Sequence, residues 1–162
     1  MTPGKRKNRT ARKPLMVVIV DDDAVQNNMF RNVLKRHFSE QVLELFFIKD
    51  GDAAVQVLRE HPGHQKLLIT DIDHPGLDGV RLARLCREKY PDVTVLIQTA
   101  FAGGEQISEA GVCADYLLQK PYRIQELVEI IEQILGRLKI YTIRNYTWIR
   151  KRRKRCKKAI MF

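Results

Sequence analysis

The chain has 162 residues, of which 44% are hydrophobic and 30% charged, an ordinary composition for a globular protein with one buried core. Its formal net charge of +10 is unevenly distributed: residues 1–13 carry six Lys and Arg, residues 137–162 carry eleven, and neither end has an acid. The residues between them hold the other twelve together with all nineteen Asp and Glu. Residues 14–136 are therefore acidic, which suits cation binding. The net charge of the whole chain describes its two ends and is no evidence that these central residues bind nucleic acid.

No apolar stretch approaches the ~20 residues that a membrane-spanning helix needs. The apolar run from Leu15 to Val20 is too short for the core of a signal peptide and leads directly into three aspartates. The three cysteines, Cys86, Cys113 and Cys156, are odd in number and lack metal-ligand spacing, which is typical of reduced thiols. We expect Cys86 and Cys113 to fill core space and the protein to be cytoplasmic.

Short runs rich in Leu and β-branched residues alternate with longer segments of helical spacing. The runs lie near residues 15–20, 42–48, 66–70, 93–98 and 114–118. The segment 24–38 places four apolar residues on one side, namely Val25, Met29, Val33 and Leu34. The segment 123–138 repeats an apolar stripe at the same spacing. Five strands alternating with helices predict an α/β fold, a doubly wound five-stranded parallel sheet with helices on both faces.

Polar side chains follow four of these runs. The triplet Asp21-Asp22-Asp23 follows the first run, and the third, fourth and fifth are followed by Asp71, Thr99 and Lys120. The carboxyl ends of parallel strands open on one crevice, so residues far apart in the sequence can converge there. Carboxylates bind a hard cation such as Mg²⁺, and a lysine and a hydroxyl can bind phosphoryl oxygens. The collection therefore predicts phosphoryl chemistry at this edge of the sheet.

These motifs together resemble the receiver domain of bacterial two-component response regulators. The resemblance covers residues 15 to about 136 and depends on Val20-Asp21-Asp22-Asp23, on Asp71 followed by Pro75-Gly76 and Asp78-Gly79, on Thr99-Ala100 and on Lys120-Pro121-Tyr122. It implies the flavodoxin-like strand order 2-1-3-4-5. That order brings the ends of the first and third strands together at the point where the strand order reverses.

The resemblance implies a role for each motif residue. The implied phosphoacceptor is Asp71, the implied ligands of Mg²⁺ are Asp21, Asp22, Asp71 and the backbone carbonyl of Asp73, and the residues implied to bind the phosphoryl group are the switch hydroxyl of Thr99 and Lys120. The implied partners are a sensor histidine kinase or phosphotransfer protein as donor and a downstream protein target. Such a single-domain receiver assists its own phosphorylation and dephosphorylation and is not otherwise an enzyme.

Simpler explanations stay open for several of these residues. An aspartate at a strand-to-helix turn can cap the helix, so at least one of the three aspartates at 21–23 is expected to do so. Asp71 itself could be a turn residue. Asp73 and His74 are expected to be exposed loop residues. The Asp73 carboxylate could also attract Mg²⁺ or orient a water that shortens the life of the phosphoryl group.

Two features depart from the family pattern. The position three residues before Lys120, where the family usually carries an aromatic switch residue, is Leu117, while Tyr116 lies four residues before it. Strand side chains alternate between faces. Either a bulge restores Tyr116 to the usual place, or the coupling between the threonine and the aromatic residue is altered. Gly103-Gly104 predicts a delayed start of the following helix.

The two basic ends are expected to lie outside the folded domain. We expect residues 1–14 to be a flexible arm, residues 15–138 to be the receiver domain, and residues 139–162 to be a basic tail that is disordered or partly helical. The tail contains the sequence Arg-Lys-Arg-Arg-Lys-Arg-Cys-Lys-Lys after several aromatic residues. It could bind nucleic acid or anionic membrane lipid, and the alternative is a solvated tail without a binding role.

Two other function classes are compatible with parts of the sequence. Asp71-Ile72-Asp73 resembles the aspartate pair of haloacid-dehalogenase-type phosphatases, in which the first aspartate is a nucleophile and the second an acid or base. Those enzymes place the pair on their first strand and a further acidic motif after the lysine, whereas here the acidic pair Asp21-Asp22 comes first. The other class is a scaffold that never turns over phosphate and binds nucleic acid or membrane through its tail.

Overall fold

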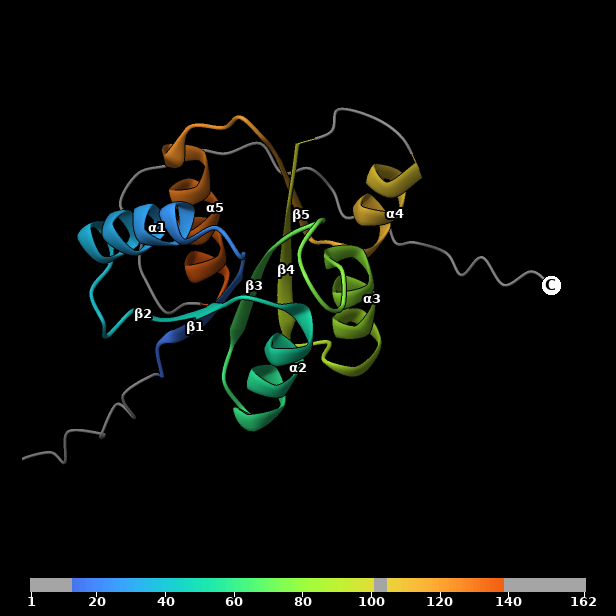
Figure 1. Ribbon diagram of the computed structural model, residues 1–162. Coiled ribbons are helices and arrows are strands. Elements are labelled where there is room, and N and C mark those ends of the chain that lie inside the picture. The colour runs from blue at the N-terminus through green and yellow to red at the C-terminus, as the bar shows by residue number, and fades with distance from the viewer. Residues whose placement is uncertain (1–12, 101–104, 139–162) are drawn as a thin grey trace, which may run out of the picture.

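The computed structural model describes residues 13–100 and 105–138. Strands and helices alternate five times, as the sequence pattern predicts (Figure 1). In chain order they are β1 (Leu15–Val20), α1 (Ala24–His37), β2 (Leu43–Ile48), α2 (Gly51–Glu60), β3 (Lys66–Asp71), α3 (Gly79–Lys89), β4 (Val93–Thr99), α4 (Glu105–Cys113), β5 (Tyr116–Gln119) and α5 (Ile124–Arg137). Each strand begins within two residues of the apolar run that predicted it.

All neighbouring strands are parallel, and their order across the sheet is β2-β1-β3-β4-β5. This arrangement confirms the predicted five-stranded sheet with its flavodoxin-like order. The chain passes from β1 outward to β2 and then returns past β1 to β3, so the direction of winding reverses between β1 and β3. Open α/β sheets bind ligands at the carboxyl ends of the strands beside such a reversal.

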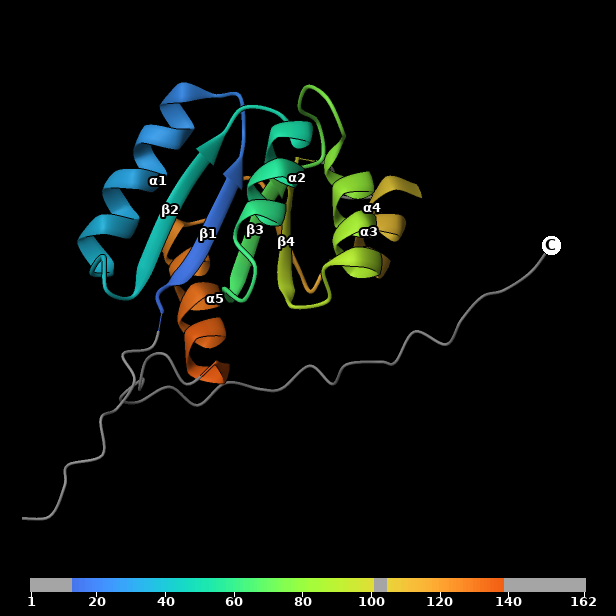
Figure 2. The same ribbon diagram turned by 90° about the horizontal axis from the view of Figure 1, so that it is seen from below.

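Alternate residues of the strands fill two separate apolar cores. The α1/α5 core lies between the sheet and helices α1 and α5, and the α2/α3/α4 core lies on the opposite face (Figure 2). All six residues of β1 are buried, with Leu15, Val17 and Ile19 in the first core and Met16, Val18 and Val20 in the second. A central strand covered on both faces has a continuous apolar sequence for this reason.

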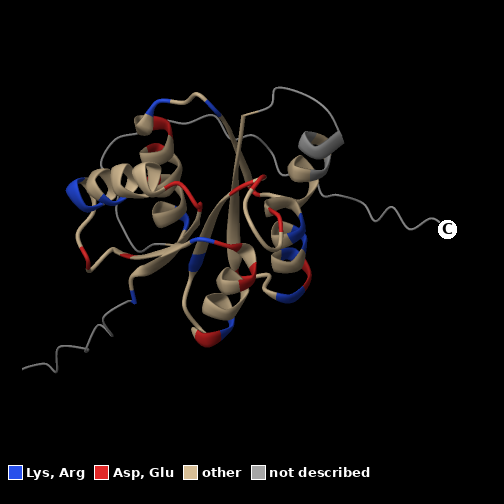
Figure 3. Cartoon of the chain, in the orientation of Figure 1, with Lys and Arg blue, Asp and Glu red and all other residues tan. Residues whose placement is uncertain are grey.

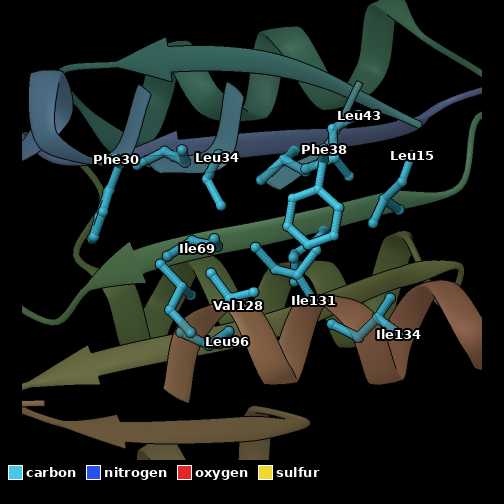
Figure 4. Packing of buried hydrophobic residues seen from close by; sticks show 14 of the residues in the cluster. Leu15, Phe30, Leu34, Phe38, Leu43, Ile69, Leu96, Val128, Ile131 and Ile134 are labelled. Atoms are coloured by element: carbon cyan, nitrogen blue, oxygen red, sulfur yellow. The ribbon is translucent and has the colours of Figure 1, made fainter. Parts of the chain in front are cut away.

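Helix α1 packs on the sheet through Phe30 and Leu34, and Phe38 beyond its end reaches toward α5 (Figure 4). These residues recur every four positions, which is the spacing of one helix face. The prediction that Val25 and Met29 belong to this face is wrong, because their side chains are 78% and 47% exposed. The other two residues of the predicted stripe do contact this core, since Leu34 is buried and Val33 is partly buried against it.

Burial also accounts for two of the three cysteines. Cys86 of α3 and Cys113 of α4 are buried free thiols in the α2/α3/α4 core. Burial raises the pKa of Cys86 to about 12, so the thiol stays protonated at neutral pH. Both side chains pack as small apolar groups, in agreement with the sequence-based expectation.

Parts of the predicted organisation lie outside the described residues. These are most of the 1–14 arm, Gly103-Gly104 and the 139–162 tail. In the part of the chain that the structure describes, no helix combines the length and the apolar character needed to cross a membrane. The division into arm, receiver domain and tail stays a prediction.

Candidate functional site

Asp21, Asp71 and Gln98 lie in one row at the carboxyl ends of β1, β3 and β4, on the α1/α5 face of the sheet. Asp71, the last residue of β3, is paired in register with Gln98 of β4. Asp21 directly follows β1 and its last residue paired with β3, Val20, so it lies at the level of Asp71. Side chains at one level of a parallel ladder point to the same face. Acidic residues therefore meet where the chain leaves β1 and β3 (Figure 3), and we call Asp21, Asp71 and Gln98 the polar row.

The Asp21 carboxylate is 5% exposed and is held at both oxygens. Oδ1 accepts the backbone N–H of Asp23 at 2.8 Å, and Oδ2 accepts the side-chain amide of Gln26 at 2.6 Å. Burial raises the pKa of Asp21, and the negative charge of Asp71 raises it further. The Asp23 N–H and the Lys120 ammonium oppose this increase without cancelling it. The protein therefore leaves the Asp21 charge incompletely compensated, which favours a bound cation.

The three adjacent aspartates of the β1–α1 connection occupy different environments. Asp23 is the N-cap of α1, and its side chain accepts the backbone N–H groups of Val25 at 2.8 Å and Gln26 at 3.3 Å. This confirms that one of the three caps the helix. Asp22 is exposed and Asp21 lies in the polar row, so these two carboxylates are the ones available to a ligand.

Asp71 is paired with Lys120, which follows the edge strand β5. Lys120 Nζ lies 2.5 Å from Asp71 Oδ2, and both side chains are 23% exposed. The other carboxylate oxygen, Oδ1, accepts the backbone N–H of Ile72 at 2.8 Å. The backbone N–H of Lys120 donates to the Thr99 carbonyl at 2.7 Å, which holds the β5–α5 loop against the end of β4. The ammonium thus reaches across β4 to the polar row.

Thr99 is the last residue of β4 and is 3% exposed. Because strand side chains alternate, its side chain starts from the face opposite to that of Gln98. Its backbone carbonyl is the acceptor for Lys120 described above. The backbone of Thr99 is therefore part of the site, and the role of its hydroxyl stays a prediction.

The loop after β3 folds back against the strand that it leaves. The Gly79 N–H donates to the Ile72 carbonyl at 3.0 Å. A Cβ at Gly79 would lie 2.0 Å from the Asp71 carbonyl oxygen, so the close approach requires glycine. Asp78 caps α3 by accepting a backbone N–H of the first turn at 2.9 Å. These contacts keep the loop, with the exposed Asp73, beside Asp71.

His74 does not lie exposed in this loop as expected. It is half-buried, with Nε2 at 2.8 Å from Thr70 Oγ1 and Nδ1 at 3.1 Å from the Pro75 carbonyl oxygen. These contacts tie the loop to the end of β3. No sequence signal predicts them, because they depend on how the loop returns to the strand.

Gln26, Gln98 and Tyr122, to which the sequence assigned no role, also belong to the site. Gln26 Nε2 lies 3.4 Å from Gln98 Oε1, and the Tyr122 hydroxyl donates to the same oxygen at 2.5 Å. Burial raises the pKa of Tyr122, and the charges of Asp21 and Asp71 add to the increase, so the hydroxyl keeps its proton. The available sequence signal was a glutamine at the end of an apolar run.

The structure distinguishes between the two alternatives for β5. Strands β4 and β5 pair in continuous register, starting from Leu96 opposite Tyr116, so no bulge shifts the strand. Tyr116 packs against the α1/α5 core, and the Arg137 guanidinium lies 5.5 Å from its ring centroid. Leu117 is 40% exposed. The position expected to carry an aromatic residue therefore carries an exposed leucine.

The oxygen atoms at this edge of the sheet fit a hard cation. Lys120 pairs with Asp71, while Asp21 and the adjacent Asp22 have no ammonium partner in the described contacts, so this end of the sheet carries excess negative charge. Mg²⁺ usually takes only one or two protein carboxylates, together with waters and substrate oxygens. Among residues 13–100 and 105–138, no three His, Cys, Asp or Glu side chains form a ready-made metal site. A cation here would depend on non-protein oxygens for part of its coordination.

Comparison with known proteins identifies relatives of this chain. A family model described as the response regulator receiver domain matches residues 17–132. The chemotaxis protein CheY of Pseudomonas aeruginosa is 32% identical over 127 residues, which cover 76% of this chain and 98% of CheY. The response regulator protein FleR of the same organism is 31% identical over 129 residues, covering 75% of this chain. The match spans 25% of FleR.

The solved structures include similar folds. The receiver domain of the sensor histidine kinase PA1611 from Pseudomonas aeruginosa PAO1 superimposes with a TM-score of 0.64 and 21% identity, covering 76% of this chain and 98% of that chain. Its crystal structure has a magnesium ion coordinated in the active site cleft. At this identity, the likeness shows a shared fold.

Proposed function

The chain belongs to the response regulator receiver domain family, and on this premise we propose that Asp71 accepts a phosphoryl group with Mg²⁺ bound beside it. The observation that carries the proposal is the 2.5 Å contact between Lys120 Nζ and Asp71 Oδ2 next to the buried Asp21. A nucleophilic carboxylate, a second acid for a cation and an ammonium for the phosphoryl oxygens are together at one edge of the sheet. The donor would be a sensor histidine kinase or a phosphotransfer protein.

In the proposed transfer, an oxygen of the Asp71 carboxylate attacks the phosphorus of a phosphohistidine. The new O–P bond replaces the N–P bond, and the imidazole leaves with the electron pair of that bond. The Ile72 N–H orients the carboxylate through Oδ1. Lys120 then binds an oxygen of the transferred group as a point charge. The receiver contributes positioning and electrostatic stabilisation, which account for most of the catalysis in phosphoryl transfer.

The proposed ligands of Mg²⁺ are the carboxylates of Asp21, Asp22 and Asp71 and the backbone carbonyl of Asp73. When bound, the cation supplies positive charge to the oxygens of the transferred group. The raised pKa of Asp21 supports this assignment, because it indicates an acid whose charge the protein compensates only in part. The magnesium ion in the PA1611 receiver, a protein of the same fold, is further support.

The proposed output is a change of surface around β4 and β5. The phosphoryl group adds negative charge beside Lys120 and Thr99, and a hydrogen bond from the Thr99 hydroxyl would draw the end of β4 toward it. Leu117 is exposed on β5, so a downstream protein target would meet an aliphatic side chain here. This surface is the part of the site in which the chain departs most from the family pattern.

The two alternative functions receive no comparable support. A haloacid-dehalogenase-type phosphatase would need an acidic motif after the lysine, but the described acids beyond Lys120 lie on α5, where Glu126 binds Arg123 at the helix start. A scaffold that binds nucleic acid or anionic membrane depends on the 139–162 tail. The tail lies outside the described residues, and its binding role stays a prediction.

Intact mass measured after incubation with acetyl phosphate tests the proposal. We expect a gain of about 80 Da, the mass of one phosphoryl group, that requires MgCl₂ and is absent in Asp71→Asn. The matched control is Asp92→Asn, an exposed aspartate just before β4 at the other end of the sheet. The decay rate of the adduct in Asp73→Asn then shows whether this acid shortens the phosphoryl lifetime.

A wild-type protein that gains no mass with acetyl phosphate would contradict the proposal only if other phosphoryl donors and mimics also fail. The absence must persist when a phosphorylated histidine-containing donor replaces acetyl phosphate, and beryllofluoride, a non-covalent phosphoryl mimic, must also leave the NMR spectrum unchanged. An adduct that also forms on Asp71→Asn would instead place the phosphoryl group on another residue.

A further inference from the structure

Gln98 is a fully buried amide near the carboxyl end of β4. Its side chain is 0% exposed, and it lies beside Asp71 in the polar row. Two residues earlier, Leu96 on the same face belongs to the α1/α5 core. A leucine at position 98 would fill a similar volume without polar atoms that need partners. Packing alone therefore does not account for the glutamine.

Hydrogen bonds connect Gln98 to Asp21 on one side and to the β5–α5 loop on the other. Gln26 Nε2 donates to Asp21 Oδ2 at 2.6 Å and to Gln98 Oε1 at 3.4 Å. The Tyr122 hydroxyl donates to the same Gln98 oxygen at 2.5 Å. Side chains from four parts of the fold thus form one continuous series, which we call the polar chain: Asp21, Gln26, Gln98 and Tyr122.

The chemistry of the groups fixes the direction of each bond in the polar chain. An ionised carboxylate only accepts hydrogen bonds, so the amide nitrogen of Gln26 faces Asp21, and its second N–H is left for Gln98 Oε1. Gln98 Nε2 is then buried without an acceptor among the described residues, which destabilises the folded protein. Residues that break a local packing rule in this way tend to occur at functional sites.

We infer that Gln98 is a positioning residue for cation binding and acts on Asp21 through Gln26. The inference rests on the proposed function, because it takes Asp21 as a ligand of Mg²⁺. The Asp23 N–H already sets Oδ1 of Asp21 at 2.8 Å, so Gln26 determines where Oδ2 lies. The bond to Gln98 gives the half-buried Gln26 side chain a second anchor, and Tyr122 anchors Gln98 in turn.

The polar chain also links the cation site to the loop that carries Lys120. Tyr122 follows Lys120 by two positions, and its hydrogen bond to Gln98 connects this loop to the polar chain. The inference therefore implies that the position of the loop and cation binding at Asp21 are coupled in both directions.

Calorimetric titration of the full-length protein with MgCl₂ tests the inference. Gln98→Leu removes the polar chain at its centre, and Tyr122→Phe removes only the hydroxyl that anchors Gln98. Loss of a contact that orients a metal ligand typically weakens metal binding by about 10–100-fold. For Gln98→Leu we expect the lower end, about tenfold in Kd, and a smaller increase for Tyr122→Phe. The double variant should match Gln98→Leu, since both changes act on one chain.

Further measurements separate positioning from a structural role. The double variant Gln98→Leu/Tyr122→Phe should keep or raise Tm in EDTA, because the buried amide nitrogen without an acceptor and the hydroxyl that donates to Gln98 are both removed, whereas a structural role would lower Tm and leave Kd unchanged. The side-chain amide NMR signals of Gln26 and Gln98 should shift together when MgCl₂ is added to the wild type. Lys66→Met alters a buried lysine at the opposite end of β3, and it should change Tm without changing Kd.

The outcomes distinguish the inference from the proposed function. Equal Kd values for the wild type, Gln98→Leu and Tyr122→Phe would overturn the positioning role and leave the cation site at Asp21 intact. Additive increases in the double variant would show that Gln98 and Tyr122 do not act through one chain. A wild-type protein that does not bind Mg²⁺ would overturn the proposed cation site and the inference together.

Discussion

Lys120 Nζ and Asp71 Oδ2 lie 2.5 Å apart, although 49 positions separate the two residues in the sequence. Asp71 ends the central strand β3, and Lys120 follows the edge strand β5, with β4 between them. Among the described residues, Lys120 is the ammonium group that pairs with Asp71. Both residues come to this place because parallel strands end at the same edge of the sheet.

Lys120→Met should slow phosphorylation of Asp71 without unfolding the protein. The substitution removes the positive charge that would bind the transferred group, and loss of one such electrostatic contact typically lowers a rate by about 10²–10³-fold. The initial rate of mass gain with acetyl phosphate measures the effect, and circular dichroism checks the fold. Lys89→Met, on the exposed side of α3, is the control. A rate within threefold of the wild type would contradict the role of Lys120.

Asp21→Asn should raise Tm at neutral pH in the presence of EDTA. Burial raises the pKa of Asp21, so the folded state binds this proton more tightly than the unfolded state does, and the ionised carboxylate destabilises the fold. The difference between variant and wild type should therefore disappear as the pH falls below the ordinary value of 3.8. Thermal unfolding at several pH values measures it. MgCl₂ should stabilise the wild type and have little effect on the variant.

Asp22→Ala should weaken Mg²⁺ binding and Asp23→Ala should lower stability, although the two residues are adjacent. Asp23 caps α1 with two hydrogen bonds, so its loss should lower the free energy of unfolding by about 1 kcal/mol. Asp22 is exposed, so its loss should weaken Mg²⁺ binding with little effect on stability. Urea unfolding and titration with MgCl₂ measure the two properties. Asp50→Ala, which removes the cap of α2, is the matched control for Asp23.

Tyr116→Ala should destabilise the protein far more than Leu117→Ala. Tyr116 packs against the α1/α5 core and stacks with the Arg137 guanidinium, so its removal should cost about 2 kcal/mol. Leu117 is 40% exposed, and its removal should cost less than about 0.5 kcal/mol. Urea unfolding measures both. The reverse order would show that β5 is shifted by one residue relative to β4.

Local patterns carried much of the information about the fold. The central strands β1, β3 and β4 are covered by helices on both faces, so most of their residues are buried and apolar whichever way they face, and such runs are visible without knowledge of the partner strands. The helices were harder to orient. Of the predicted stripe, Leu34 is buried and Val33 is partly buried, but Val25 and Met29 are exposed, and Phe30 packs in the core in their place.

The sequence by itself placed Asp21, Asp22, Asp71, Thr99 and Lys120 near strand ends, because each lies within two residues of the end of an apolar run and matches a short motif. Only the tertiary structure decided which atoms meet: Lys120 with Asp71, and Gln26, Gln98 and Tyr122 in one chain with Asp21. A buried glutamine has no local partner that could reveal its role. Its contacts depend on strand order and register, which bring together residues from four elements, and these are properties of the whole sheet.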